Sequence, residues 1–316
     1  MHIPSASAAP VTALLTLATA ASALLLSATP AQAQLRPLSS TPHTTNPLEG
    51  PHLSDPLRRD GPLGVTRLQA AIGPGGDSDY QPQTGQPGKD VVWVPTPQPL
   101  IEAMLRVADV KPGDFVVDLG AGDGRIAIAA ARDFGAQALG IEYDPNLVAL
   151  ARRNAARAGV AGLASFRRAD IFATDFSNAT VVTLYLLPSL NLRLRDRLLA
   201  MKPGTRIVSH AFTMGEWEPE RTISTDDAYG YFWIVPANIA GRWAFEANGR
   251  RFAAEIGQQF QHLTMAPGGA LRHGRVKGTA VTLTRSDGSR LTGEISENRE
   301  QMAGPGWLAI RIHDRR

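Results

Sequence analysis

The sequence predicts an α/β fold with a mostly parallel sheet, followed by a small antiparallel β domain. Two patterns carry this prediction. Between residues 90 and 238, short apolar runs alternate with helical segments, which is typical of βαβ units. After Pro236 the helical pattern stops, and strand-like runs are separated by Asn248-Gly249 and Asp287-Gly288, both strong hairpin signals. We therefore expect an α/β domain over 90–238 and an all-β domain over 239–316.

The elements of the α/β part follow from its apolar runs and turn residues. The helix expected at 145–158 is the best marked, because Asp144 can cap it, Pro145 takes its first position and Gly159 can end it. Runs at 221–225 and 229–235, with no helix between them, predict an antiparallel hairpin that completes a seven-stranded sheet. The other expected elements are helices at 99–108, 125–134 and 189–201 and strands at 115–119, 138–142, 164–168, 180–186 and 205–209.

The C-terminal part is expected to form a curled sheet or a partial barrel. Its strand-like runs are short, and glycine-containing turns separate them. The expected strands are 241–246, 250–260, 275–284, 290–295 and 307–312.

The N-terminal region predicts export. Residues 11–26 form an apolar stretch of signal-peptide length, and Ala31-Gln32-Ala33 follows as an A-x-A cleavage site. The stretch is too short and too rich in Ser and Thr for a spanning helix, so no transmembrane helix is expected in the mature chain. We expect a signal peptide over 1–33 and a periplasmic or secreted protein. Residues 34–89 contain nine prolines and little periodicity, which predicts a disordered tether.

The composition excludes several classes of chemistry. The chain has no cysteine, so disulfides, thiolate metal sites and cysteine nucleophiles are ruled out. The seven histidines show no metal-ligand spacing, and no metal is expected. The formal net charge is only +3 and the basic residues are scattered, so there is no specific nucleic-acid signal.

A glycine-rich turn after the first expected strand predicts a nucleotide-like ligand. The run is Asp118-Leu119-Gly120-Ala121-Gly122-Asp123-Gly124, and it leads into a helix. Such a turn lets a ligand approach backbone N–H groups at a helix N-terminus. The dinucleotide pattern G-x-G-x-x-G would need glycine where this chain has Arg125. The pattern therefore resembles motif I of the class I S-adenosylmethionine (SAM) methyltransferases more than an NAD fingerprint, with Asp118 placed to hold the cofactor's ammonium group.

Two further acidic residues follow the next strands. Glu142 ends the strand at 138–142, about twenty residues beyond the glycines, where a carboxylate can accept hydrogen bonds from ribose hydroxyls. Asp170 follows the strand at 164–168. The resemblance to class I methyltransferases implies that Asp170 accepts from the adenine amino group while Ile171 packs on the ring.

Other segments resemble a narrower family. They are VPTP (94–97), DLGAGDGRI (118–126), GIEYDP (140–145), ATVVTLYLLPSLN (179–191) and KPGTRIVSHAF (202–212). Together they resemble the protein lysine methyltransferases that include a broad-specificity archaeal enzyme and mitochondrial enzymes. The resemblance implies a Rossmann-like seven-stranded methyltransferase sheet, SAM as cofactor and N-methylation of lysine side chains. It also implies that Pro95 and Thr96 close over the cofactor. Trp93 departs from the tyrosine often found before V-P-T-P, and the leader and C-terminal domain are absent from compact members.

The acceptor is expected at the ends of the fourth and fifth strands. Thr183 and Tyr185 are candidates for contacting it, and His210 for accepting its proton. A lysine must lose its proton before attack, since its ordinary pKa is about 10.4, and burial lowers that pKa. The proton can leave to water, so no dedicated base is required. Trp93, Tyr185 and Trp217 are candidate aromatic walls for a cation.

Three alternatives remain beside methylation of a protein lysine. The first is N- or O-methylation of a small molecule, because cofactor motifs do not reveal the acceptor. The second is an NAD-dependent oxidoreductase, against which Arg125 and Asp170 argue. The third is an exported protein that binds without turnover, which the N-terminal leader suggests because SAM is made in the cytoplasm. Binding of SAM without methyl transfer would favour the third.

Overall fold

The computed structural model describes residues 80–313, so the signal peptide expected at 1–33 and most of the tether expected at 34–89 lie outside the described residues. The α/β part contains four helices and seven strands within that range. They are α1 (Gln98–Val107), β1 (Phe115–Leu119), α2 (Arg125–Phe134), β2 (Gln137–Glu142), α3 (Pro145–Arg157), β3 (Ala164–Arg168), β4 (Val181–Leu184), α4 (Pro188–Leu199), β5 (Arg206–His210), β6 (Arg221–Ser224) and β7 (Tyr229–Ile234).

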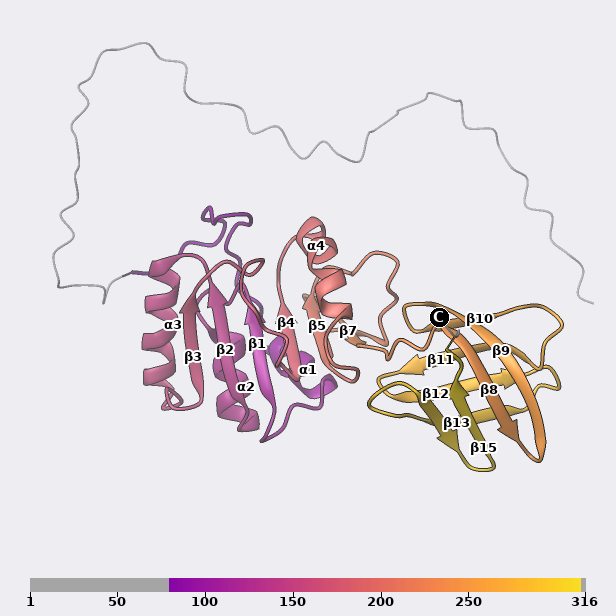
Figure 1. Ribbon diagram of the computed structural model, residues 1–316. Helices are drawn as coiled ribbons and strands as arrows, with labels where there is room; N and C mark the ends of the chain where they lie inside the picture. Colours follow the sequence, from indigo (N-terminus) through magenta and orange to yellow (C-terminus); the bar gives the residue numbers. More distant parts are fainter. Residues whose placement is uncertain (1–79, 314–316) are drawn as a thin grey trace, which may run out of the picture. The chain divides into compact units, whose positions relative to one another are not determined.

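The strands form one seven-stranded sheet in the order β3-β2-β1-β4-β5-β7-β6 (Figure 1). The first five are parallel, and β7 runs antiparallel to both β5 and β6. This is the sheet that the sequence predicts, hairpin included. Strand order reverses at β1, whose two neighbours are β2 and β4, and ligands of parallel α/β sheets bind beyond the carboxyl ends of strands at such a point.

Helices cover the sheet on both faces because its central strands are apolar on both sides. Neighbouring residues of a strand point to opposite faces. Accordingly, Val116 belongs to the core cluster that contains α1, α2 and α3, and Val117 to the cluster that contains α4. Helix α3 begins as predicted, since the Asp144 carboxylate accepts a hydrogen bond from the Asn146 N–H at 2.8 Å.

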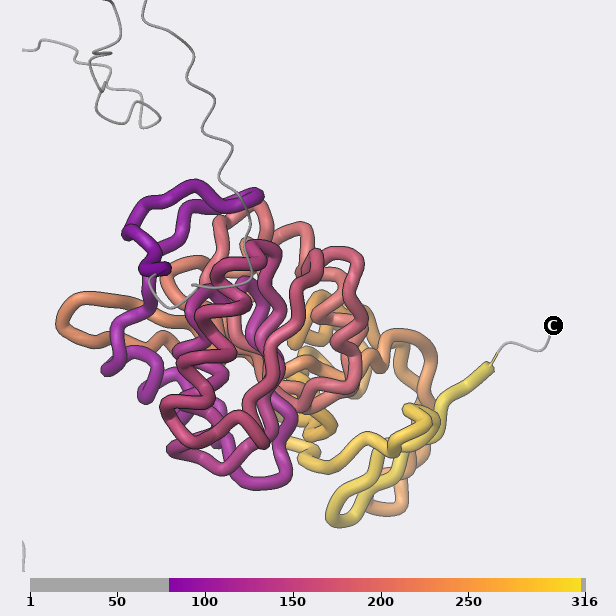
Figure 2. The backbone as a smooth tube through the Cα atoms, turned by 90° about the vertical axis from the view of Figure 1, so that its left-hand side faces the viewer, coloured from indigo at the N-terminus to yellow at the C-terminus, as the bar shows by residue number. Residues whose placement is uncertain are grey.

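The described chain begins with a folded hairpin, which corrects the expected limit of the tether at residue 89. The indigo segment in Figure 2 is this hairpin, residues 80–96. The Gly85 N–H donates to the Trp93 carbonyl at 2.8 Å, and the Trp93 N–H donates to the Gln86 carbonyl at 2.9 Å. A third bond, from the Gly88 N–H to the Val91 carbonyl at 2.9 Å, closes the turn. Backbone pairing thus orders a stretch that its proline content predicts to be disordered.

The C-terminal strands form a closed barrel, in the order β10-β11-β12-β13-β14-β15-β8-β9. One expected strand, 275–284, is wrong: it is a hairpin, because Gly278 adopts a positive φ of 62° and turns the chain between Lys277 and Ala280. The strands are β8 (Gly241–Ala247), β9 (Arg250–Gln259), β10 (His262–Met265), β11 (Leu271–Lys277), β12 (Ala280–Arg285), β13 (Arg290–Ile295), β14 (Gln301–Gly304) and β15 (Trp307–Arg311).

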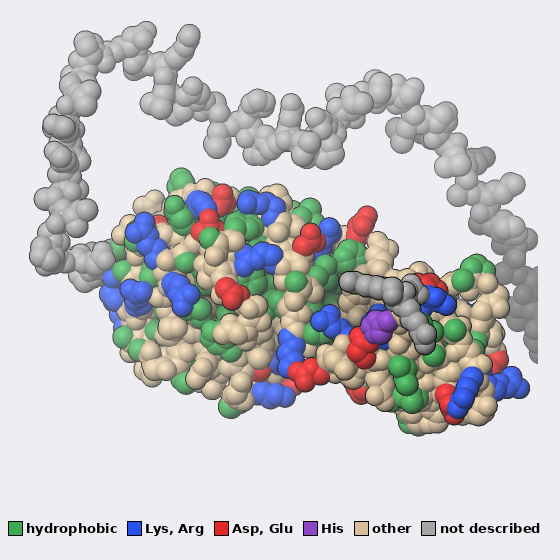
Figure 3. All heavy atoms as spheres, viewed as in Figure 1, with side chains coloured by type: hydrophobic (Ala, Val, Ile, Leu, Met, Phe, Trp, Pro, Cys, Tyr) green, Lys and Arg blue, Asp and Glu red, His purple; other side chains and the backbone are tan. Residues whose placement is uncertain are grey.

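Large side chains fill the barrel interior. Trp243, Phe245 and Trp307 are almost fully buried there among aliphatic residues. The indole N–H groups of Trp243 and Trp307 both donate to backbone carbonyls, at 2.9 Å each, so neither leaves a buried donor unpaired. The barrel is therefore a packed unit and not a container. On the face drawn in Figure 3, acidic, basic and apolar side chains are interspersed. Within residues 80–313, no helix combines the length and hydrophobicity required to cross a lipid bilayer.

Candidate functional site

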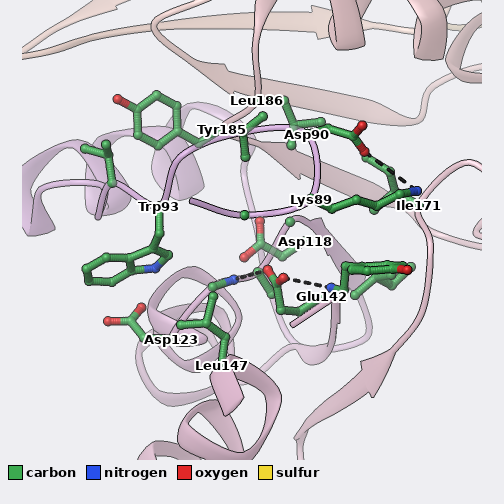
Figure 4. A pocket seen from close by; sticks show the side chains of 18 of the residues that line it. Lys89, Asp90, Trp93, Asp118, Asp123, Glu142, Leu147, Ile171, Tyr185 and Leu186 are labelled. Atoms are coloured by element: carbon green, nitrogen blue, oxygen red, sulfur yellow. Dashed lines mark hydrogen bonds and ion pairs between the residues drawn. The ribbon is translucent and has the colours of Figure 1, made fainter. Parts of the chain in front are cut away.

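A pocket lies where the carboxyl ends of β1, β2, β3 and β4 meet the hairpin 80–96 (Figure 4). Its floor is the glycine turn after β1. Gly120, Gly122 and Gly124 all have positive φ, at 80°, 56° and 84°, a conformation that side chains disfavour. A Cβ on Gly122 would lie 2.7 Å from the Trp93 indole nitrogen, so a side chain there would displace the pocket wall. The turn thus has both the backbone and the space that a close-lying ligand requires.

Asp118 is a buried carboxylate at the end of β1 that lines this pocket. Thr183 donates to its Oδ1 at 2.7 Å. Burial raises the pKa of Asp118 to about 7, helped by the charges of Glu142 and Asp123 and opposed by the Thr183 hydrogen bond. A cation bound beside Asp118 would stabilise its ionised form. The residue therefore fits the ammonium group that the sequence assigns to it.

Glu142 is held in place by backbone groups on both sides of the switch point. Its Oε2 accepts from the Gly122 N–H at 2.9 Å, and its Oε1 accepts from the N–H groups of Tyr143 and Asp144 at 2.7 and 2.9 Å. Each carboxylate oxygen has two lone pairs, so Oε2 keeps the capacity to accept a hydroxyl. Glu142 lines the pocket, as its predicted contact with ribose requires.

Asp170 and Ile171 line one end of the pocket. The Oδ1 of Asp170 accepts from the Phe172 N–H at 2.8 Å, and its Oδ2 forms a 2.6 Å ion pair with Lys89 Nζ. These hydrogen bonds, first of all the one from Lys89, lower the pKa of Asp170 below its usual range. In Figure 4 Lys89 and Ile171 lie at one end of the pocket, and Trp93 lies at the other.

Pro95 and Thr96 line the pocket from the last part of the hairpin segment. Thr96 is buried, and its carbonyl accepts from Arg125 Nη1 at 3.1 Å. Arg125 also pairs with Asp123 at 2.6 Å. The segment that the resemblance places over the cofactor is therefore tied to the glycine turn on which the cofactor is expected to lie.

Tyr185 lines the pocket, and two aromatic rings lie close to it. The His210 ring stacks on it with 3.7 Å between centroids, and the Phe212 ring lies 6.3 Å away. His210 is buried, its Nδ1 lies 3.1 Å from Thr96 Oγ1, and burial lowers its pKa to about 4. His210 is not among the residues that line the pocket; it supports two that do. Its predicted direct contact with the acceptor is corrected to a supporting position.

Two other expected acceptor contacts are corrected. Thr183 is fully buried behind Asp118, because its hydroxyl faces the carboxylate across neighbouring strands of the sheet. Trp217 is buried in the core between Trp233 and Phe260, and its carbonyl accepts from the Trp233 indole at 2.8 Å. Neither side chain lines the pocket, whereas Trp93 and Tyr185 do.

Sequence reasoning missed three contributors to the site. Lys89 falls within the expected tether, although Gly88 and Asp90 on either side of it are turn residues. The ion pair of Asp123 with Arg125 has no sequence signal beyond its place in the glycine turn. Asn191 is buried on α4, and its Nδ2 donates to the carbonyls of Phe212 and Thr213 at 3.2 and 3.3 Å, which holds the loop after β5. Within residues 80–313, no three His, Asp or Glu side chains are grouped to bind a metal ion.

The order of the sheet, the glycine turn and the acidic residues after β1, β2 and β3 define a Rossmann-like class I methyltransferase, with SAM as its cofactor. The family model described as the ANTKMT methyltransferase domain matches residues 118–221. A protein-lysine N-methyltransferase of Saccharolobus islandicus is 43% identical over 139 residues, which cover 43% of this chain and 86% of that protein. The chain belongs to this family of lysine methyltransferases.

Other relatives match over smaller shares of their length. The mouse adenine nucleotide translocase lysine N-methyltransferase is 37% identical, and the match covers 42% of this chain and 58% of that enzyme. A second mouse enzyme, a lysine N-methyltransferase of an ATP synthase component, is 35% identical, with 48% and 61% covered. A crystal structure described as an RNA methyltransferase from Salinibacter ruber, with S-adenosyl-L-homocysteine bound, has 54% sequence identity and a TM-score of 0.45, and covers 46% of this chain and 96% of that one.

Proposed function

We propose that this protein transfers the methyl group of SAM to the side-chain nitrogen of lysine residues in proteins. The observation that carries the proposal is the match to the archaeal protein-lysine N-methyltransferase, which spans 86% of that protein and includes the glycine turn, Glu142 and the segment around Tyr185.

The acceptor end of the pocket suits an uncharged lysine amine. Tyr185 offers an aromatic ring to the incoming side chain, and a cation is attracted to such a ring. With its pKa lowered to about 4, His210 is neutral at pH 7 and adds no positive charge behind that ring. A lysine that leaves water for this end of the pocket has its pKa lowered by desolvation, which increases the fraction of nucleophilic amine.

The reaction is an in-line displacement. SAM supplies an electrophilic methyl group on its sulfonium, the lysine nitrogen forms the new C–N bond as the C–S bond breaks, and the ammonium proton leaves to water beforehand. The residues of the chain then act by position: Asp118 and Glu142 fix one partner, and Tyr185 aligns the other. Correct placement of two reactants can lower a barrier by about 7–11 kcal/mol.

The test is transfer of radioactive methyl from SAM by the purified chain to proteins of a cell lysate, followed by amino-acid analysis. Methyl-lysine is the expected product. Asp118→Asn is expected to abolish labelling, whereas Asp133→Asn, at an ion pair outside the pocket, serves as the matched control. The chain itself has only four lysines, Lys89, Lys111, Lys202 and Lys277, so any self-labelling is readily mapped.

Two outcomes would contradict the proposal. Label found only in a small molecule would favour methylation of a small acceptor. Binding of SAM with no labelled product in protein or small-molecule fractions would favour a protein that binds without turnover.

We also propose that the protein is exported. Support comes from the apolar stretch at 11–26 and the A-x-A site at 31–33. Fractionation of cells that express the full chain, with N-terminal sequencing of the product, tests this. An N-terminus at residue 34 in the periplasm or medium is expected, and an intact leader in the cytoplasm would refute export.

A further inference from the structure

The tip of the hairpin 80–96 reaches the end of the pocket where the adenine is expected. The turn at the tip, residues 88–91, is closed by backbone pairing, and Val91 packs against the core cluster that contains α4. The hairpin contributes pocket-lining residues from Gln86 to Thr96. It is thus a wall of the pocket and not a solvated tail.

Lys89 projects from this tip between the residues that follow β2 and β3. Its Nζ lies 2.6 Å from Asp170 Oδ2 and 4.8 Å from the centroid of the Tyr143 ring (Figure 4). Tyr143 comes directly after Glu142, the expected ribose ligand, and Asp170 is the expected adenine ligand. The ammonium group therefore lies across the region that the adenine must enter.

The two oxygens of Asp170 are both engaged. Oδ1 accepts from the Phe172 N–H and Oδ2 accepts from Lys89. An adenine amino group can donate to this carboxylate along the pocket side only where Lys89 now donates. The Lys89 and Asp170 side chains are about one-third exposed, at 35% and 32%, so water can replace either partner when the pair opens.

We propose that Lys89 is a latch on the cofactor site: it occupies Asp170 until the adenine of the incoming cofactor displaces it. Lys89 thereby sets cofactor affinity through a contact that the cofactor must break. This inference rests on the cofactor assignment and on adenine binding at Asp170, and it goes beyond both by giving the hairpin a competing role.

Lys89→Met in the full chain tests the latch, because methionine keeps the length of the side chain and removes its charge. Exposed ion pairs are weak, so we expect S-adenosylhomocysteine to bind about two- to fivefold more tightly to the variant in titration calorimetry. Raising the salt concentration should tighten binding to the unaltered protein by screening the pair, and should change binding to Lys89→Met much less. Lys202→Met, which removes an exposed ion pair with Glu297, is the matched control and should leave affinity unchanged.

A double-mutant cycle separates the latch from other effects of Lys89. Asp170→Asn removes the ion pair and keeps an oxygen that can accept from adenine. In that background Lys89→Met should have no effect on affinity. Equal or weaker binding of the ligand by Lys89→Met than by the unaltered protein would overturn the proposal. If the unaltered protein failed to bind S-adenosylhomocysteine at all, the cofactor assignment itself would fail, which is a distinguishable result.

Discussion

The hydroxyl of Thr183, on β4, donates a 2.7 Å hydrogen bond to Oδ1 of Asp118, on the neighbouring strand β1. Both side chains are buried, and Asp118 alone lines the pocket. The pair sets the charge of the site. Burial pushes the pKa of Asp118 up to about 7 and the hydroxyl pulls it down.

Cofactor affinity is therefore expected to depend on pH. Only ionised Asp118 attracts the cofactor's ammonium group, so SAM should bind about tenfold more weakly at pH 6 than well above pH 7. Thr183→Val removes the contact that favours ionisation and should move this transition to higher pH, whereas Thr183→Ser should retain it. Titration calorimetry from pH 5.5 to 8.5 measures the midpoint. An identical midpoint in Thr183→Val would show that the hydroxyl does not tune the carboxylate.

The glycine turn offers a matched pair of substitutions. Gly122 and Gly159 both have positive φ, at 56° and 71°, so alanine strains the backbone at either position. Only at Gly122 would the new Cβ meet another atom, Trp93 Nε1 at 2.7 Å; around Gly159 there is nothing within 4 Å. We expect both variants to lose about 1 kcal/mol of stability, and Gly122→Ala alone to bind S-adenosylhomocysteine at least about tenfold more weakly. Thermal melts and calorimetry separate the two effects. Equal affinities would mean that Trp93 moves aside freely.

Tyr185 is expected to act on the acceptor and not on the cofactor. Tyr185→Ala removes the aromatic ring from the pocket wall, and loss of a cation–π contact of about 0.5–2 kcal/mol should raise KM for the lysine substrate roughly two- to thirtyfold. Tyr185→Phe keeps the ring and should change KM little. Steady-state kinetics at saturating SAM provides the measurement. A tyrosine-to-phenylalanine effect as large as the alanine effect would assign the role to the hydroxyl.

His210 should make the protein sensitive to acid. Its pKa is about 4 in the folded state and about 6.5 in an unfolded chain, so folding favours the neutral ring. The stability contribution is complete above pH 6.5 and is lost as the pH falls from 6.5 to 4.

His210→Phe retains a ring beside Tyr185 and removes this ionisation. Relative to the unaltered protein, it should gain roughly 1–3 kcal/mol between pH 7 and pH 4. Denaturant unfolding at both pH values checks this, and the titration of Asp118 is common to both proteins and cancels. His262→Gln, at an exposed ring, should show no such gain. A gain of the same size in both variants would exclude burial of His210 as the cause.

The fold was predictable where pattern and burial agree. Strand β4 reads as a continuous apolar run because helices cover both of its faces, and α3 is marked by its cap and by Pro145. In the barrel, β10 and β14 have only four residues each, too few to show alternation, and the turn at Gly278 lies inside a run that looks continuous. Short strands joined by tight turns are specified by closure of the barrel more than by their own sequence.

The predicted cofactor ligands lie around one pocket because each follows a parallel strand or the glycine turn, and strand ends meet at one edge of the sheet. The acceptor side was harder. Thr183 lies on the strand expected to face the acceptor, yet its side chain points to Asp118, and a shift of one residue along a strand reverses the face. The Lys89 contact joins residues 81 positions apart, and local pattern carries no information about such a pair.

Closure of the C-terminal barrel has a consequence for the colloidal behaviour of the protein. Every barrel strand has two partners, so in the described part of the chain the unpaired strand edges belong to β3 and β6. The first carries Arg167 and Arg168, both exposed, and the second is four residues long. Charge and brevity both discourage pairing with a strand of another molecule. The folded protein should therefore resist strand-mediated aggregation at high concentration despite its large content of β structure.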